Sequence, residues 1–239
     1  MYNRDSMYDS GPGGEPVELV IFDCDGVLID SEVISLMVIR ELLETYGVVI
    51  DETYFTREFL GRSFLCVKET VKRDFGVLLR EEFEQQYLSA LLERFDSHLQ
   101  PVDGIESLVA QLNIPFCVAT SSHRGRTNRA LSATGLLSYF DDAIYTASQV
   151  QNGKPAPDLF LFAAEQQKVE PKNCLVIEDS LSGLQAGVAA GMQVWHFQGG
   201  SHMPASIGSI SIPAGISRVI SHWSQFFTAH PELRIKSPS

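Results

Sequence analysis

The stretch V-E-L-V-I-F-D-C-D-G-V-L-I-D, from Val17 to Asp30, is the strongest indication of fold in the chain. It begins with a short apolar run rich in Val and Ile, which is typical of a buried strand in a parallel sheet. The run ends in two carboxylates, Asp23 and Asp25, followed at once by Gly26. Ligands of open α/β sheets bind beyond the carboxyl ends of the strands, so this end is a candidate site. A strand followed by an ordinary Asp-Gly turn is the simpler alternative.

The composition is that of a globular protein with an excess of acidic residues. The 239 residues are 44% hydrophobic and 20% charged, which is enough for one large domain or for a domain with an insert. The formal net charge of -12 argues against nucleic acid as a partner, because phosphate backbones require stripes of Lys and Arg. An acidic protein that handles an anionic substrate needs a local cation, either a metal ion or a few basic side chains.

The cysteines indicate a reducing compartment. Cys24, Cys117 and Cys174 lie in or beside apolar runs, Cys66 lies in a polar helical stretch, and no spacing is typical of a zinc site or a disulfide framework. We therefore expect reduced cysteines in a cytoplasmic protein. Because no apolar run approaches the roughly 18 residues that a membrane span needs, we expect no membrane partner.

A long helical block is expected directly after the first strand. Apolar spacing and composition predict helices from Ser31 to about Tyr46 and over residues 53–60, 64–75 and 81–95. From residue 101 onward, short apolar runs alternate with helical segments. Strands are expected at 116–119, 143–145, 174–177, 192–197 and, at an edge, 216–220; helices are expected at 105–112, 126–134, 157–166, 181–190 and near 222–230. This alternation predicts βαβ units and a parallel sheet.

Further reactive side chains lie at the ends of the expected strands. Thr120 follows the second strand, Glu178 and Asp179 follow a later one, and Lys154 lies in a Pro-rich loop between them. Each has an ordinary explanation, as a helix cap, an N-cap pair or a solvated lysine. The carboxyl ends of parallel strands share one edge, however, so these groups and the aspartates near residue 23 can converge.

Phosphoryl transfer is the chemistry that needs such a set. One carboxylate attacks phosphorus and becomes an aspartyl phosphate. A second carboxylate two residues away protonates the leaving alkoxide and later deprotonates water. Mg²⁺ lets the anionic ester approach several carboxylates, and a hydroxyl and an ammonium hold the remaining phosphate oxygens.

The sequence resembles the haloacid dehalogenase superfamily. Its four motifs are D-C-D-G-V at 23–27, V-A-T-S at 118–121, G-K-P at 153–155 and I-E-D-S at 177–180. The resemblance extends from Val17 to about Phe197. It is similar in particular to the subgroup of β-phosphoglucomutase and small sugar-phosphate phosphatases, in which a helical cap is inserted just after the first motif.

The resemblance implies the catalytic roles. Asp23 is expected to be the nucleophile and Asp25 the general acid/base, while Thr120 and Lys154 hold the phosphoryl group. The backbone N–H of Ser121 is expected to contact the phosphate.

The resemblance also implies a Mg²⁺ site. Asp23 and Asp179 are expected to supply carboxylate ligands and Asp25 its backbone carbonyl, and Glu178 is expected to bind the ion directly or through water.

The fold implied is α/β, a Rossmann-like parallel sheet core with an inserted all-helical cap domain. The expected core comprises residues 17–30 and 100–230, and the expected cap comprises residues 31–99. We expect a flexible N-terminal tail at 1–16 and a C-terminal tail at 231–239.

Substrate choice is expected to depend on the cap and on the loop after the second strand. The turn G-R-S at 61–63 resembles the specificity loop of the family, so Arg62 is a candidate for a second anionic group of the substrate; a solvated arginine is an equal alternative. His123, Arg124 and Arg126 form a basic cluster. Of these we favour Arg124 as a substrate contact, with solvent exposure of all three as the alternative.

The predicted function is a magnesium-dependent phosphatase for a small phosphorylated metabolite, a sugar or sugar-acid phosphate, acting as a monomer. The alternative is a phosphomutase of the β-phosphoglucomutase type, which needs a second cationic phosphate grip. In sequences resembling that enzyme an arginine follows the cap turn and a histidine lies on the first helix, where this chain has Phe64 and Ser35. A dehalogenase would not need Asp25. A binding protein without turnover would be expected to have a broken motif, and none is broken.

Overall fold

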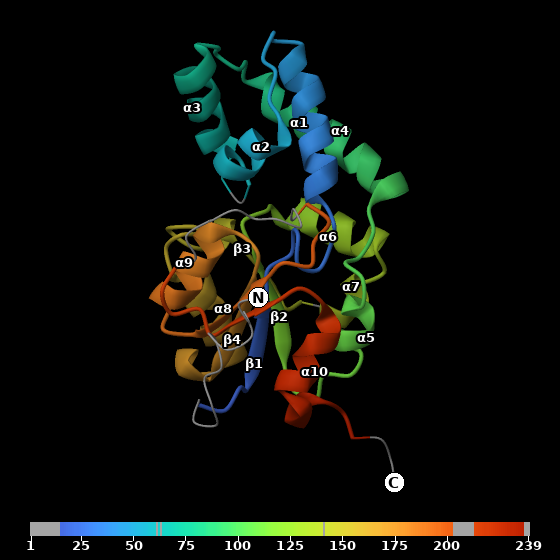
Figure 1. Cartoon of the computed structure of the whole chain (residues 1–239), viewed down its shortest axis with the longest axis vertical. Coiled ribbons are helices and arrows are strands. Elements are labelled where there is room, and N and C mark those ends of the chain that lie inside the picture. Colours follow the sequence, from blue (N-terminus) through green and yellow to red (C-terminus); the bar gives the residue numbers. More distant parts are fainter. Residues whose placement is uncertain (1–14, 61, 63, 141, 203–212, 237–239) are drawn as a thin grey trace, which may run out of the picture.

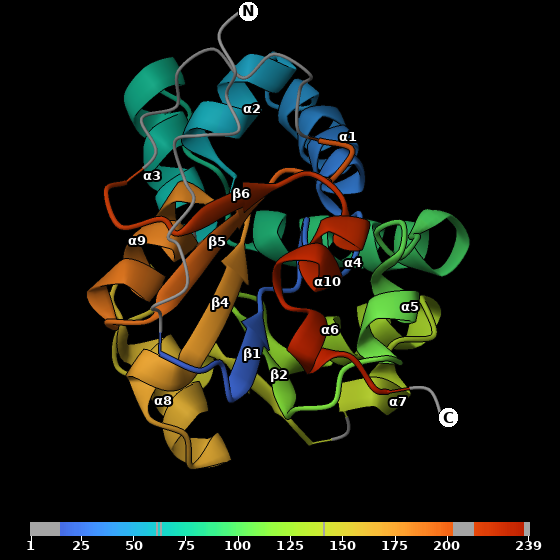
Figure 2. The same cartoon turned by 60° about the horizontal axis from the view of Figure 1, so that its bottom comes forward.

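The chain forms a single parallel sheet that is covered by helices on both faces. The computed structural model describes residues 15–60, 62, 64–140, 142–202 and 213–236, so most of the predicted N-terminal tail lies outside the described residues. Within them the sheet has six parallel strands in the order β3-β2-β1-β4-β5-β6, of which Figure 2 labels all but β3. The strands are β1 Leu19–Phe22, β2 Phe116–Thr120, β3 Ile144–Thr146, β4 Cys174–Glu178, β5 Gln193–Phe197 and β6 Arg218–Ile220.

The strand β1 lies at the centre of the sheet, where the strand order changes direction. Phe22, its last residue, is aligned with Val118 of β2 and with Ile177 of β4. The chain therefore leaves β1, β2 and β4 at the same edge of the sheet. This edge beside a change in strand order is where open α/β sheets bind ligands.

Alternate residues of β1 face two different apolar clusters. Val20 and Phe22 belong to the cluster under α5, α6, α7 and α10, and Leu19 and Ile21 belong to the cluster under α8 and α9 (Figure 1). Gly187 of α9 brings that helix close to the sheet, because a Cβ there would lie 2.8 Å from Val194. These helices are α5 Ile105–Val109, α6 Arg124–Ala133, α7 Leu137–Phe140, α8 Asp158–Gln167, α9 Leu181–Ala189 and α10 Phe226–Ala229.

The first four of the helices that follow β1 lie together beyond the carboxyl ends of the strands, at the top of Figure 1, whereas α5 packs on the core. They bury a third apolar cluster of their own, which includes Ile39, Phe55 and Val71. They are α1 Glu32–Glu44, α2 Glu52–Glu58, α3 Phe64–Phe75 and α4 Glu82–His98. The predicted fold class, an α/β parallel core with an all-helical cap insert, is therefore confirmed.

The chain enters and leaves this helical insert at one point. The backbone N–H of Asp30 donates to the carbonyl of Gln100 at 2.9 Å, and that of Val102 donates to the carbonyl of Leu28 at 2.9 Å. The two connections thus run side by side immediately behind the loop that carries Asp25.

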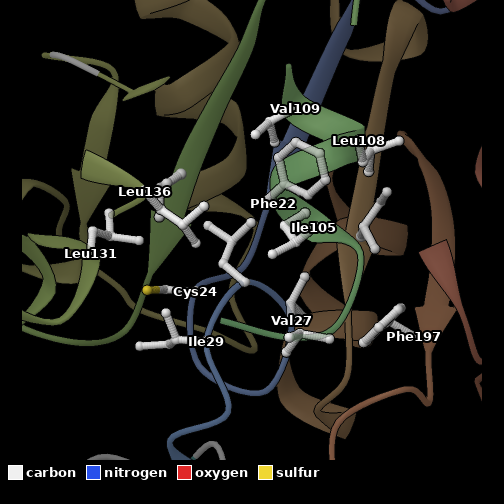
Figure 3. Close-up of a cluster of buried hydrophobic side chains, with 14 of the residues drawn as sticks. Phe22, Cys24, Val27, Ile29, Ile105, Leu108, Val109, Leu131, Leu136 and Phe197 are labelled. Carbon is white, nitrogen blue, oxygen red and sulfur yellow. The ribbon is translucent and has the colours of Figure 1, made fainter. Parts of the chain in front are cut away.

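The loop after β1 is anchored by its own apolar residues. Val27, Leu28 and Ile29 are fully buried, and Figure 3 shows Val27 and Ile29 among the core side chains near Phe22 and Cys24. The sequence D-G-V-L-I therefore combines two functions, because its carboxylate remains at the sheet edge while the following residues pack into the core.

The C-terminal segment differs most from the sequence-based expectation. Instead of one helix at 222–230, the chain forms a 3-10 turn, Trp223–Gln225, followed by α10, and a further 3-10 turn, Pro231–Leu233. Leu233 is buried, and the N–H of Ile235 donates to the carbonyl of Gln111. Packed structure thus continues past residue 230, into the segment predicted as a tail. None of the helices in the described ranges is both long and apolar enough to span a membrane.

Candidate active site

Asp23 lies one residue beyond β1 and is held by the backbone of the neighbouring strand. Its N–H donates to the carbonyl of Ile177 at 3.0 Å, and its side chain is almost completely buried. The chain then turns at Gly26, which has a φ of +76°. A Cβ at this position would lie 1.9 Å from Oδ2 of Asp179. Glycine is therefore required here both for the backbone conformation and for the close approach of the two loops.

Three carboxylates converge at this edge of the sheet. One oxygen from each of Asp23, Glu178 and Asp179 lies within 4.8 Å of the others, and all three residues are buried. Burial, together with the charge of Glu178, raises the pKa of the Asp23 carboxyl well above its usual value. Space for Glu178 exists because residue 183 is glycine, where a Cβ would lie 2.0 Å from the Glu178 Cδ.

Lys154 partly neutralises this acidic cluster. Its Nζ donates to Asp23 at 2.5 Å, to Glu178 at 2.7 Å and to the carbonyl of Ala119 at 3.0 Å. The side chain is only 2% exposed and lies over the ring of Phe160. Burial alone would lower the pKa of Lys154, but the charges of Asp23 and Glu178 outweigh it and raise that pKa. The ammonium thus stays charged beside the expected nucleophile.

One oxygen of the cluster has unused binding capacity. Oδ2 of Asp179 is buried and accepts no hydrogen bond from the described residues. Nε2 of His202 lies 3.1 Å away, but without hydrogen-bond geometry, and burial lowers the pKa of His202 so that its ring is neutral at pH 7. A buried anionic oxygen without a partner is costly. Because Mg²⁺ prefers oxygen ligands, the cluster fits a divalent cation of this kind.

Asp25 makes a separate and complete set of contacts on the cavity side of the loop. Its two oxygens accept hydrogen bonds from Arg126 at 2.7 and 2.8 Å, from Ser31 at 2.5 Å and from Ser122 at 2.9 Å. Burial raises the pKa of Asp25, but Arg126 and the hydroxyl donors outweigh it, so the pKa lies below its usual value. Asp25 therefore has a different electrostatic environment from Asp23.

Thr120 and Ser121 complete the sheet edge. Thr120 is buried at the end of β2, where its Oγ1 accepts a hydrogen bond from the N–H of Ser122 at 3.1 Å. Ser121 is exposed, and both residues line the cavity described next.

A cavity of about 420 Å³ separates the sheet edge from the helical insert. The sheet edge supplies its polar wall, and apolar side chains of the insert such as Phe55 and Phe59 supply the opposite wall. Arg62 lines it from the insert and is exposed, while Gly61 and Ser63 of the predicted specificity turn lie outside the described residues. Such a cavity suits a small molecule whose charged groups face the sheet edge.

A model of the haloacid dehalogenase-like hydrolases matches residues 20–197, which is most of the chain. The chain belongs to the haloacid dehalogenase-like hydrolase family. The family predicted from the four motifs is thus confirmed.

Several known proteins are similar to this chain over most of its length. The chain is 31% identical to the 6-phosphogluconate phosphatase of Escherichia coli K12, over 78% of this chain and 85% of that protein. Among solved structures, it is similar to a family hydrolase from Deinococcus radiodurans R1 with bound phosphate and sodium, with 30% identity, a TM-score of 0.75 and coverage of 93% and 99%. It is also similar to a putative beta-phosphoglucomutase from Thermotoga maritima, with 25% identity, a TM-score of 0.69 and coverage of 91% and 100%.

The structure brings the residues from the four family motifs to one edge of the sheet, but it separates the basic residues after β2. Arg124 donates to the carbonyl of Ile144 at 2.8 Å, lies 3.6 Å from a carboxylate oxygen of Asp142, and is absent from the cavity lining. Arg126, two residues later, reaches Asp25 instead. The sequence predicts one basic cluster in which Arg124 is the favoured substrate contact, whereas in the structure Arg126, and not Arg124, lines the cavity. The helical spacing would have helped, because residues two apart point to different sides of a helix.

His202 was not singled out from the sequence. Its ring is accommodated by Gly26 and Gly200, since a Cβ at either position would lie 2.7 Å or less from a ring atom of His202. The one sequence signal was the pair of glycines directly before Ser201.

Proposed function

We propose that this protein is a phosphoric monoester hydrolase, a magnesium-dependent phosphatase that acts on a small phosphorylated sugar or sugar acid. The observation that carries the proposal is the buried cluster of Asp23, Glu178 and Asp179, bridged by Lys154 and open to a small cavity that Asp25 also lines. The names of related phosphatases, including those for 6-phosphogluconate and fructose 1-phosphate, support the substrate class.

The acidic cluster is the proposed magnesium site. Asp23, Glu178 and Asp179 would supply carboxylate oxygens, and Asp25 its backbone carbonyl. When bound there, the ion offsets the charges of the carboxylates and of the phosphate, so that two anions can react with one another.

In the proposed first step, a carboxylate oxygen of Asp23 attacks the phosphorus of the substrate. An O–P bond forms on Asp23, and the bond from phosphorus to the ester oxygen breaks. Lys154 and Thr120, with the N–H of Ser121, hold the phosphoryl oxygens in place. Asp25, whose pKa lies below its usual value in the substrate-free structure, first takes up a proton as the substrate binds and then gives it to the departing alkoxide.

In the proposed second step, water takes the place of the alcohol. Asp25 accepts a proton from the water as its oxygen bonds to phosphorus, and the bond from phosphorus to Asp23 breaks. Inorganic phosphate leaves, Asp25 releases this proton to solvent, and both aspartates return to their starting states. The helical insert supports this sequence by closing the site from bulk water during the first step.

A phosphatase fits the cavity better than a phosphomutase does. Phe64, at the position where β-phosphoglucomutase-like sequences have a second arginine, packs its ring against Phe83 and Tyr87. Ser35, at the position of the histidine, is buried. Neither supplies the cationic grip that a bisphosphate would need.

Arg62 and Arg124 stay proposed substrate contacts, of which Arg62 lines the cavity.

We further propose that the enzyme is a cytoplasmic monomer, with residues 31–99 as its cap domain. Free cysteines support the compartment, since Cys24, Cys117 and Cys174 are buried as unpaired thiols.

The proposal is tested by assaying phosphate release from a panel of sugar and sugar-acid phosphates with Mg²⁺. Turnover should stop with excess chelator and return with Mg²⁺, and Asp23→Asn should abolish both turnover and the phosphoenzyme. Full activity in chelator would contradict the metal assignment. Isomerisation of β-glucose 1-phosphate, started by a trace of bisphosphate and with little phosphate release, would instead favour the mutase.

A further inference from the structure

Arg126 holds a carboxylate inside the proposed active site. Its Nη1 and Nη2 donate to the two oxygens of Asp25 at 2.7 and 2.8 Å, and Nη1 also donates to Oγ of Ser122 at 2.6 Å. The paired side chains are only 10% and 14% exposed. This two-pronged geometry matches a carboxylate of any origin, since a planar guanidinium binds planar carboxylates through two parallel hydrogen bonds.

The contacts of Asp25 cannot all persist during catalysis. An ionised carboxylate has about four lone-pair positions, and Asp25 already receives hydrogen bonds from Arg126, Ser31 and Ser122 that fill this number. To contact the leaving oxygen of a substrate, Asp25 must give up at least one of these donors. The two bonds from Arg126 are the ones most readily exchanged. Arg126 is the charged donor, so another anion can take the place of Asp25 as the acceptor of these two bonds.

Arg126 itself is the less movable member of the pair. Its guanidinium lies 5.1 Å from the centre of the Phe95 ring on α4, and Phe95 is buried. When the pair separates, we therefore expect the Asp25 side chain to rotate toward the substrate while Arg126 stays in place, facing the cavity that both residues line.

We propose that Arg126 binds a carboxylate of the substrate and thereby selects phosphate esters whose alcohol part carries a carboxylate group. This inference rests on the proposed phosphatase function and names the substrate class of that same site. The substrate carboxylate takes the position on Arg126 that Asp25 occupies in the structure, and Asp25 turns to the leaving oxygen.

Charge favours a carboxylate over a second phosphate at this position. Among the described residues, the side chains that hydrogen-bond to Arg126 or lie under its guanidinium are Asp25, Ser122 and Phe95, none of which is basic. One guanidinium balances one carboxylate. A dianionic phosphate in the same place would leave an unbalanced negative charge next to Asp25, which is unfavourable in a largely buried position.

The distance also suits a short sugar acid. The leaving oxygen must lie within one hydrogen bond of Asp25, and the Arg126 guanidinium lies one hydrogen bond from Asp25 on its other side. The leaving oxygen and the guanidinium are therefore separated by roughly 5–8 Å. A carboxylate a few carbon atoms from the phosphate ester can span that distance. 6-Phosphogluconate and glucose 6-phosphate form a suitable pair of probes, because they share the phosphate and the carbon chain but only the former has the carboxylate.

The kinetic test compares these two probes on four proteins. The wild-type enzyme should prefer 6-phosphogluconate, and Arg126→Gln should reduce the ratio of the two kcat/KM values about 10- to 100-fold, mainly through KM, which is the usual scale for losing a charged hydrogen bond. Arg126→Lys should keep part of the preference. Arg129→Gln is the matched control, because Arg129 lies on the same helix α6 and pairs at the surface with Asp96. An equal loss for both probes would overturn the proposal, and so would a wild-type enzyme without preference.

A binding test separates this proposal from the phosphatase assignment. In the Asp23→Asn background, calorimetry should show tighter binding of 6-phosphogluconate than of glucose 6-phosphate, and adding Arg126→Gln or Arg126→Lys should reduce that difference. The result does not require turnover. If no ester is hydrolysed but the difference persists, the phosphatase assignment fails and the role of Arg126 stands. If Asp23→Asn binds the two probes equally or binds neither, the role of Arg126 is wrong.

Discussion

Replacing Lys154 by methionine should strongly destabilise the metal-free protein. The ammonium contacts Asp23, Glu178 and a backbone carbonyl, and the side chain is 2% exposed. Removing one member of a buried, hydrogen-bonded ion pair costs about 3–5 kcal/mol, because the other charges are left without compensation. For a chain of this size each kcal/mol corresponds to about 2–4 °C in Tm, so Tm should fall by roughly 6–20 °C.

The assay is thermal unfolding followed by circular dichroism near neutral pH with excess chelator. Mg²⁺ should raise the Tm of Lys154→Met more than that of the wild type, because the cation then compensates carboxylates that have lost their ammonium. Lys172→Met is the control, since Lys172 is 61% exposed and lies 3.8 Å from Glu15; its Tm should hardly change. A Lys154→Met protein that melts within about 2 °C of the wild type in chelator would refute the reasoning, because such a small shift corresponds to about 1 kcal/mol or less.

Two further outcomes are expected at the acidic cluster. Gly183→Ala should weaken Mg²⁺ binding measured by calorimetry, because its Cβ would lie 2.0 Å from the Glu178 Cδ, whereas Gly125→Ala, which meets no atom within 4 Å, should bind Mg²⁺ normally; equal affinities would contradict the role given to the glycine. The Mg²⁺-induced rise in Tm should be larger at about pH 8 than at about pH 5.5. A carboxyl such as Asp23, whose pKa is raised by burial in the folded state, destabilises the metal-free protein above that pKa, and the cost disappears as pH falls below the unfolded value. An equal Mg²⁺-induced rise in Tm at both pH values would show that protons and Mg²⁺ do not compete for the carboxylates of the acidic cluster.

The central strands and their ends were predictable because their signals are local. A short run such as Leu19–Phe22 is apolar at every position, and a strand buried on both faces requires that pattern. The groups that follow it, Asp23 and Asp25, belong to motifs whose order along the chain was sufficient to place them on one sheet edge. The parallel topology then brought Lys154 to the same edge without any further information from the sequence.

The remaining contacts depend on how distant elements are oriented. Arg126 and Asp25 are separated by about a hundred positions in the chain, and their pairing requires α6 to present one particular side to the loop after β1. The packing of Leu233 likewise depends on contacts between the C-terminal segment and residues near Gln111. No local periodicity encodes such contacts, so propensity and apolar spacing could not predict them. The short helix Leu137–Phe140 was missed because four residues give no periodicity to recognise.

The paired connections to the helical insert have a consequence for how such proteins diversify. Asp30 and Gln100 are joined by a backbone hydrogen bond, so residues 31–99 leave the core and return to it at nearly the same point. The entropy of closing a loop grows only with the logarithm of its length, so the size of a segment whose ends already meet has little effect on the core. Segments of different length and shape can therefore be exchanged at this junction while strand order and register stay the same. Exchange of the gene segment for residues 31–99, by crossovers at its two ends, can thus supply a new recognition surface to a catalytic apparatus that is already assembled.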